Sequence, residues 1–344
     1  MSNKPTIILD PHFRRMTEIF TQTDLERLHS LANVIWGQDD PMPQDAFDHV
    51  ISDAVAVICA DWRYGHASLT HAANLRAILA ISGGFPRTLD YDYCFTRGIR
   101  VLSAAPAFAR SVAEMALALT LAASRDIAAG DQAMRAGNEK WLHAGNEGCF
   151  MLFGKPVGFI GYGSIGRALR PLLEPFGCPI SVYDPWLTAG YLRSQGLPAV
   201  ELDELLETSK VIFVLAAPSS ENQALLSRQR LEQIRPGSVL VLVSRAHVVD
   251  FDALTELVNQ HRFKAAIDVF PSEPLEADHP IRRAPAAVLS AHRAGPTEEG
   301  CWEIGQMLVD DLEAIVQDLP PQRLQLAQPE LITRYTTNTI KKRS

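Results

Sequence analysis

The 344-residue sequence is poor in cysteine, in excess positive charge and in long apolar runs. Its five cysteines are scattered and form no C-x-x-C pair, which argues against a disulfide framework or a zinc site and favours a reducing cytoplasm. His66 and His71 are five residues apart rather than four and have no carboxylate cluster nearby in the sequence, so we expect no metal. The formal net charge of −8 gives no broad basic field, so we expect neither nucleic acid nor membrane as a partner. We also find no apolar run of the ~18 residues that a transmembrane helix needs.

Residues 157–184 form the segment around which the chain is organised. A short apolar run is followed by Gly161, Gly163 and Gly166 in G-x-G-x-x-G spacing, then by a helical pattern and a second apolar run that ends in Asp184. The first glycine permits a tight turn, the second lets the backbone approach a pyrophosphate, and the third lets the helix pack closely on its strand. The spacing alone is a weak signal, but the strand, helix and acid around it favour dinucleotide binding over a chance turn.

Asp184 is expected to select the cofactor. Its carboxylate can accept hydrogen bonds from the adenosine ribose diol and would repel a 2′-phosphate. No arginine follows it before Arg193. The sequence therefore predicts NAD rather than NADP.

Short apolar runs alternate with helical patterns along most of the chain. With 47% hydrophobic residues, the chain is long enough for two domains, and the alternation indicates a doubly wound parallel α/β sheet in each. Residues 111–125 are apolar or small on nearly every helical face and predict a helix that is buried on all sides, between domains or in a subunit interface. A long amphipathic helix is expected over 297–317, and a solvated tail from Pro320 onward. The expected strands are 6–9, 34–36, 55–59, 77–81 and 100–102, then 157–160, 211–215, 239–243, 265–268 and 287–290.

Arg245, Glu273 and His292 each follow a different expected strand of the cofactor domain. In a doubly wound sheet these positions open onto the same crevice as the glycine turn. A guanidinium can bind the carboxylate of a 2-keto acid, and an imidazole can donate a proton to its carbonyl oxygen while hydride arrives at carbon. A neighbouring carboxylate favours the protonated imidazole. Taken singly, each residue is more often structural, as a surface ion pair or a packed histidine.

In the first domain, Trp62 and the pair Gly83 and Gly84 follow strand exits. Open parallel sheets bind ligands beyond the carboxyl ends of their strands, so we expect these three residues to contact the substrate, with plain turns as the alternative. A large aromatic wall at Trp62 predicts an acid bulkier than glyoxylate.

Four segments of the chain match successive signatures of one family. They are the glycine turn with Asp184, and residues 244–250, 268–274 and 291–295, which read SRAHVVD, DVFPSEP and AHRAG. In order and spacing they resemble the D-isomer-specific 2-hydroxyacid dehydrogenases over nearly the whole chain. The resemblance implies a Rossmann NAD-binding domain, residues 105–297, inserted in a flavodoxin-like substrate domain, residues 1–104 and 298–344. It also implies a homodimer built around the cofactor domains.

The same resemblance assigns roles to single residues. Arg245 would bind the substrate carboxylate, Glu273 would tune the histidine, His292 would act as acid/base, and Asp268 would bind the nicotinamide side of the cofactor. Ser164 and Ile165 would cover the pyrophosphate. The implied cofactor contacts are Gly161, Gly163, Ser164, Ile165, Gly166, Asp184, Pro218, Val243, Ser244, Asp268 and Gly295.

Three short stretches depart from the family pattern. The family usually has Arg-Gly-Gly at Arg245-Ala246-His247, His-x-Pro at Ala216-Ala217-Pro218, and G-x-G-x-D-N where residues 83–88 read GGFPRT. The identity of the acid therefore stays open. Glu273 argues against the formate dehydrogenase branch, which resembles this family but has an amide at that position.

The leading interpretation is a cytoplasmic NAD-dependent oxidoreductase, acting on a CH–OH group, that interconverts a 2-keto acid and a D-2-hydroxy acid. The alternative is an NAD(H)-sensing binding protein, like the corepressors that resemble this family, in which cofactor occupancy controls assembly. Arg245, Glu273 and His292 favour the enzyme without deciding against the sensor. The sequence leaves open the physiological direction and the effect of the atypical 83–88 loop on the reaction.

Overall fold

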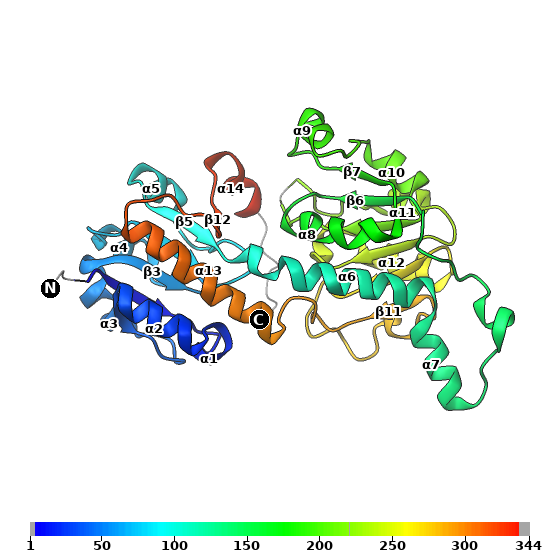
Figure 1. The fold of residues 1–344 in the computed structure, drawn as a ribbon, viewed down its shortest axis with the longest axis horizontal. Coiled ribbons are helices and arrows are strands. Elements are labelled where there is room, and N and C mark those ends of the chain that lie inside the picture. The colour runs from blue at the N-terminus through cyan, green and yellow to red at the C-terminus, as the bar shows by residue number, and fades with distance from the viewer. Residues whose placement is uncertain (1–3, 220, 337–344) are drawn as a thin grey trace. The chain divides into compact units, whose positions relative to one another are not determined.

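The computed structural model describes residues 4–219 and 221–336, which divide into two compact units (Figure 1). Unit 1 contains residues 4–109 and 296–336 of the described chain, and unit 2 is Arg110–Gly295. The chain therefore leaves unit 1 once and returns to it once. The predicted α/β class with two doubly wound sheets is confirmed.

Unit 1 is built on one six-stranded sheet with helices on both faces. Its strands are β1 (Thr6–Asp10), β2 (Asn33–Trp36), β3 (Ala54–Cys59), β4 (Ala77–Ala80), β5 (Arg100–Ser103) and β12 (Gln325–Leu326). Its helices are α1 (Met16–Ile19), α2 (Gln22–Leu31), α3 (Gln44–Val50), α4 (Gly65–His71), α5 (Tyr91–Thr96), α13 (Glu298–Val316) and α14 (Pro329–Thr336), with 3₁₀ turns η1 (Ile51–Asp53) and η2 (Ala105–Phe108).

The sheet of unit 1 has the order β12-β5-β4-β3-β1-β2, and only β12 runs antiparallel to its neighbour. Successive strand residues face opposite sides, so Ile7 and Leu9 lie in one buried cluster and Ile8 in the other. Helices α1, α2 and α13 fill the first cluster, and α3, α4, α5 and α14 fill the second. Burial on both faces explains why these strands read as continuous apolar runs.

Unit 2 has a second six-stranded sheet, in which every strand is parallel to its neighbours. Its strands are β6 (Val157–Ile160), β7 (Ile180–Tyr183), β8 (Val211–Val214), β9 (Val239–Leu242), β10 (Lys264–Ile267) and β11 (Ala287–Leu289). Its helices are α6 (Ala109–Ser124), α7 (Ile127–Ala136), α8 (Ser164–Leu173), α9 (Ala189–Ser194), α10 (Leu202–Thr208), α11 (Arg228–Gln233) and α12 (Phe251–Asn259), with η3 (Leu142–Asn146), η4 (Glu174–Phe176), η5 (Ala246–Val248) and η6 (Pro280–Arg283). The order is β11-β10-β9-β8-β6-β7, so the chain winds in opposite directions on the two sides of β6, where such sheets bind ligands.

The helical stretch Ala105–Ser124, η2 followed by α6, is long and apolar enough to cross a membrane by length and composition alone. The prediction that no segment reaches this length was wrong, because Arg110 and Glu114 interrupt the apolar run but leave the helix apolar on average. Half of the stretch is buried inside the protein, and buried core helices share this composition, so it is weak support for a membrane span. Arg110, Glu114 and Ala118 form an exposed stripe on this helix in the described chain, and burial of the stripe between domains or in a subunit interface stays a prediction.

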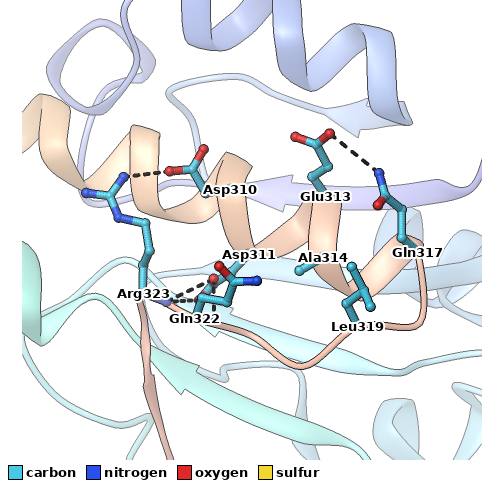
Figure 2. Close-up of a pocket in the computed structure, with 8 residues that line it drawn as sticks. All are labelled: Asp310, Asp311, Glu313, Ala314, Gln317, Leu319, Gln322 and Arg323. Atoms are coloured by element: carbon cyan, nitrogen blue, oxygen red, sulfur yellow. Dashed lines mark hydrogen bonds and ion pairs between the residues drawn. The ribbon is translucent and has the colours of Figure 1, made fainter.

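The segment after Pro320 packs on unit 1 as far as residue 336, instead of forming the predicted solvated tail. Fully buried Asp311 on α13 accepts hydrogen bonds from the backbone N–H groups of Gln322 at 2.7 Å, Arg323 at 3.0 Å and Leu324 at 2.7 Å. Figure 2 shows Asp311, Gln322 and Arg323 beside a surface hollow of about 300 Å³, where Arg323 also pairs with Asp310 at 2.6 Å. Residues 337–344 lie outside the described chain.

Candidate active site

The glycine turn after β6 has three features that fit a dinucleotide. Gly161 has a φ of +93°, and a Cβ there would lie 2.8 Å from the Ala216 backbone, so glycine is required. A Cβ on Gly163 would meet nothing described within 4 Å, which leaves open space before α8. Gly163 is the N-cap of α8 and provides no side-chain hydrogen bond, so the N–H groups of the first turn, from Ser164 and Ile165 onward, can receive a pyrophosphate.

Asp184 follows β7 and lies against the glycine turn. Its Oδ2 accepts a hydrogen bond from the Tyr162 N–H at 2.8 Å, and its Oδ1 accepts one from the Trp186 N–H at 2.9 Å. A carboxylate oxygen can accept two hydrogen bonds, so each oxygen keeps capacity for a ribose hydroxyl. The structure therefore places Asp184 where the predicted selection of the cofactor requires it.

Arg245, Glu273 and His292 follow three neighbouring strands. Strands β9, β10 and β11 are adjacent and parallel, and the three residues lie beyond their carboxyl ends in that order. The Nδ1 atom of His292 lies 2.6 Å from Oε2 of Glu273, and the two side chains are 40% and 37% exposed. The structure therefore brings the predicted acid and imidazole into direct contact while leaving the ring accessible.

The hydrogen bonds of this pair fix the tautomer of the imidazole. A carboxylate oxygen accepts, so Nδ1 of His292 carries the hydrogen and Nε2 is the nitrogen that can exchange a proton with a substrate. Glu273 is held in turn by the Phe270 N–H, which donates to its Oε1 at 3.0 Å. Arg245 donates from Nη1 to the backbone oxygen of Ser244 at 2.7 Å.

Asp268 holds the turn that carries His292. It is fully buried, and its carboxylate accepts hydrogen bonds from the Arg293 N–H at 2.9 Å and the Ala294 N–H at 3.1 Å. Its backbone oxygen accepts from the His292 N–H at 2.8 Å, and His292 has a left-handed φ of +51°. Direct contact with the nicotinamide side does not fit this burial, so we correct that expectation and describe Asp268 as a positioning residue. The sequence did not reveal this role, because the partners are backbone amides.

The remaining predicted cofactor residues line the same edge of the sheet. The Ser244 hydroxyl is buried and has no hydrogen-bond partner among the described residues, so it can serve a polar group such as the nicotinamide amide. Val243 is 4% exposed, and Pro218 and Gly295 are half-buried. In residues 4–219 and 221–336, no group of three His, Cys, Asp or Glu side chains could hold a metal ion.

Trp62, predicted to face the substrate, is a core residue of unit 1. Its side chain is 1% exposed, donates from Nε1 to the Gly65 oxygen at 3.0 Å, and meets the Phe47 ring edge-on at 5.8 Å. The expected aromatic wall is therefore wrong, because the ring turns into the core. Gly83 and Gly84 are exposed on the turn after β4, as a substrate loop requires.

Known proteins resemble this chain in sequence and in fold. Residues 117–294 match the profile described as "D-isomer specific 2-hydroxyacid dehydrogenase, NAD binding domain". The D-3-phosphoglycerate dehydrogenase of Mycobacterium tuberculosis is 30% identical over 261 residues, covering 76% of this chain and 49% of that protein. The glyoxylate reductase of Thermofilum pendens is 28% identical over 319 residues, covering 89% and 92%. The crystal structure of a phosphoglycerate oxidoreductase from Rhizobium etli is 33% identical with a TM-score of 0.84, covering 94% of this chain and 99% of that one.

The extent of these matches decides the family. The chain spans about half the length of the phosphoglycerate dehydrogenases it matches. The profile match covers more than half of this chain and contains the glycine turn, Asp184, Arg245, Glu273 and His292. The chain belongs to the D-isomer-specific 2-hydroxyacid dehydrogenase family.

Proposed function

We propose that this protein is an NAD-dependent dehydrogenase that interconverts a small 2-keto acid and a D-2-hydroxy acid. The 2.6 Å contact between His292 Nδ1 and Glu273 Oε2 carries the proposal. A protein that only senses NAD(H) needs the glycine turn, whereas an imidazole oriented for proton transfer is required only by the enzyme, so this contact favours the enzyme. We assign cofactor binding to unit 2 and contacts with the substrate to Gly83 and Gly84 of unit 1.

Three side chains divide the work of the proposed reaction. The bound nicotinamide supplies hydride in the reductive direction. Arg245 holds the substrate carboxylate through its planar pair of N–H donors. His292 Nε2 donates a proton to the carbonyl oxygen, and Glu273 holds the ring and stabilises the imidazolium. In the oxidative direction, neutral Nε2 accepts the hydroxyl proton.

We propose NAD as the cofactor because Asp184 presents a carboxylate at the end of β7. A 2′-phosphate would meet this carboxylate at close range, and like charges repel there. The relatives act on 3-phosphoglycerate, glyoxylate and hydroxypyruvate by their names, so we propose a small 2-keto or 2-hydroxy acid of this class as substrate. Because Trp62 is buried in the core, we withdraw the expectation that the substrate is bulkier than glyoxylate.

A homodimer is also part of the proposal, with the arm formed by residues 127–153 as its contact. The arm extends from the rest of unit 2, and no residue of α7 is buried in the described chain (Figure 1). Apolar side chains this exposed mark protein contacts. The large apolar residues of the arm, 56–85% exposed, are Ile127, Met134, Trp141, Leu142, Met151 and Phe153. Light scattering should report a dimer for wild type and a monomer for the double variant Met134→Glu, Leu142→Glu; a wild-type monomer would contradict the proposal.

Turnover of NADH tests the proposed activity. Reduction of glyoxylate, hydroxypyruvate and related keto acids is followed by the loss of NADH absorbance. Oxidation of 3-phosphoglycerate is followed by the formation of NADH from NAD. His292→Ala should lose roughly 10²-fold or more in kcat and still bind NADH. Because Glu273 orients the ring and stabilises the imidazolium, Glu273→Gln should lower kcat for reduction while NADH binding stays near wild type. Tight NADH binding without turnover of any acid in the panel would refute the enzyme and favour the sensor.

A further inference from the structure

One departure from the family pattern contacts the residue that directly follows another in unit 2. His247 occupies a position where the family usually has glycine, two residues after Arg245. Its Nε2 lies 3.0 Å from the backbone oxygen of Ser219, in the loop after β8 where the chain has Ala216-Ala217-Pro218 in place of the usual His-x-Pro. We call residues 215–219 and 221–226 the β8 loop. The chain thus lacks the usual imidazole in this loop and instead carries one that reaches it from the Arg245 turn.

The bond between His247 and Ser219 is buried enough to matter. Ser219 is 3% exposed and His247 is half-buried. A carbonyl oxygen can only accept, so Nε2 of His247 is the donor. Removing the imidazole would leave this nearly buried carbonyl with only the longer hydrogen bond from the Asn222 N–H, at 3.4 Å, which costs more than losing an exposed hydrogen bond.

Backbone hydrogen bonds join the far end of the β8 loop to the same turn. The Ala224 N–H donates to the His247 oxygen at 2.9 Å, and the Leu226 N–H donates to the Val248 oxygen at 3.0 Å. Inside the loop, Asn222 accepts from the Ser219 N–H at 2.8 Å and donates to the Ala217 oxygen at 2.7 Å. The backbone hydrogen bonds to the Arg245 turn come from Ala224 and Leu226, at the far end of the loop. His247 therefore adds a side-chain hydrogen bond nearer the beginning of the loop, at Ser219.

The near end of the β8 loop also contacts the glycine turn. Leu215 donates from its N–H to the Ile160 oxygen at 2.9 Å, and a Cβ on Gly161 would lie 2.8 Å from both N and Cα of Ala216. Strand β8 lies between β6 and β9 in the sheet, so its loop stands between the glycine turn and the Arg245 turn. A dinucleotide that crosses this edge from the glycine turn toward Arg245 passes this loop.

We infer that His247 is a positioning residue that ties the β8 loop to the Arg245 turn, so that the floor of the cofactor site and the substrate-binding guanidinium are held as one unit. The expected effect on substrate binding rests on the proposed function, whereas the expected effect on cofactor binding requires only that the protein binds NADH. His247 does not exchange protons with the substrate. Its contribution is to fix the loop before the cofactor arrives, which lowers the ordering cost of binding.

Three variants of His247 test this role. Gln places an N–H donor near the Nε2 position, Leu fills the space without a donor, and Ala removes both. The Kd for NADH, measured by fluorescence titration without substrate, should rise about 2- to 10-fold in His247→Ala and His247→Leu and return toward wild type in His247→Gln. Hydrogen exchange in the peptide spanning the β8 loop should speed up in the same two variants. His261→Ala, at an exposed histidine of unit 2, is the matched control and should bind NADH as wild type does.

Each outcome separates this inference from the proposed activity. An unchanged Kd for NADH in His247→Ala, or equal binding by the Gln and Leu variants, would refute the inference that His247 positions the β8 loop. If His247→Ala does not fold, the Gln and Leu variants give the same comparison, because both fill the site. If wild type binds NADH but reduces no keto acid, the proposed function fails while the tie is still decided by the NADH and exchange measurements. If keto acids are turned over, KM for the acid should rise in His247→Leu more than kcat falls, and His247→Gln should reverse that rise.

Discussion

Asp268→Ala is the perturbation whose size follows most directly from the structure. The change removes a fully buried carboxylate that accepts from the Arg293 and Ala294 N–H groups at 2.9 and 3.1 Å. Hydrogen bonds to a carboxylate contribute about 1.5–3 kcal/mol each, so losing two should lower the free energy of unfolding of unit 2 by about 3–6 kcal/mol. For a unit of this size that is about 6–24 °C in Tm. Because the turn also carries His292, kcat should fall roughly 10- to 100-fold in protein that is still folded.

Asp311→Ala is the matched control, because Asp311 makes the same kind of contact in unit 1. Its buried carboxylate accepts from three consecutive backbone N–H groups, far in the sequence from the His292 turn. This variant should unfold at lower temperature by a similar amount, yet keep wild-type kcat below its transition. Calorimetry gives Tm, and NADH oxidation at 25 °C gives kcat. An Asp268→Ala protein with wild-type Tm, or with lowered Tm and wild-type kcat, would show that the carboxylate does not hold the catalytic turn.

Three further predictions concern the cofactor, the thiols and acid. Asp184→Ala should weaken NAD binding and narrow its lead over NADP in paired titrations; unchanged affinities for both would remove Asp184 as the selector. Burial raises the pKa of the Cys94 thiol to about 12 and raises that of Cys59 further, so peptide mapping after brief alkylation at neutral pH should find half-buried Cys149 modified before either of them, and the reverse order would be inconsistent with the fold. Although burial alone would raise the pKa of Asp310, hydrogen bonds, above all from Arg323, hold it below its usual value of 3.8. The stabilisation by ionised Asp310 is therefore present above that value and is lost as pH falls through the lower pKa of the folded state. Between pH 5 and 3, the unfolding midpoint of Asp310→Asn should therefore fall less steeply with decreasing pH than that of wild type; equal slopes would refute the prediction.

The strands could be predicted closely because a strand buried on both faces appears in the sequence as a continuous apolar run. Every residue of β4 is fully buried, so the whole strand is apolar, and the predicted run 77–81 is only one residue longer than the strand. Helix α7 gave no such mark. None of its residues is buried in the described chain, so no side of the helix has to be apolar for the fold, and the sequence predicted no helix at these positions.

The site was predictable where topology alone decides it. Glu273 and His292 meet because β10 and β11 are neighbours in the sheet, and their order in the chain implies this. The direction of the Trp62 side chain depends instead on Phe47, which comes from α3, a separate segment of unit 1. The role of Asp268 depends on backbone amides, which look alike at every position of a sequence.

The insertion of unit 2 within unit 1 sets an order for folding during synthesis. Residues 110–295 are contiguous, so their sheet and its helices are complete as soon as they leave the ribosome. The first 109 residues emerge earlier but lack α13, whose Ile304, Leu308 and Leu312 complete the buried cluster around Ile7 and Leu9. The part of this cluster that α13 covers therefore stays exposed until nearly 200 further residues have been made, although α1 and α2 are already present, and in this interval the nascent chain is prone to aggregate. A chain that stops before residue 296 would carry a finished cofactor unit beside an unfinished, aggregation-prone one.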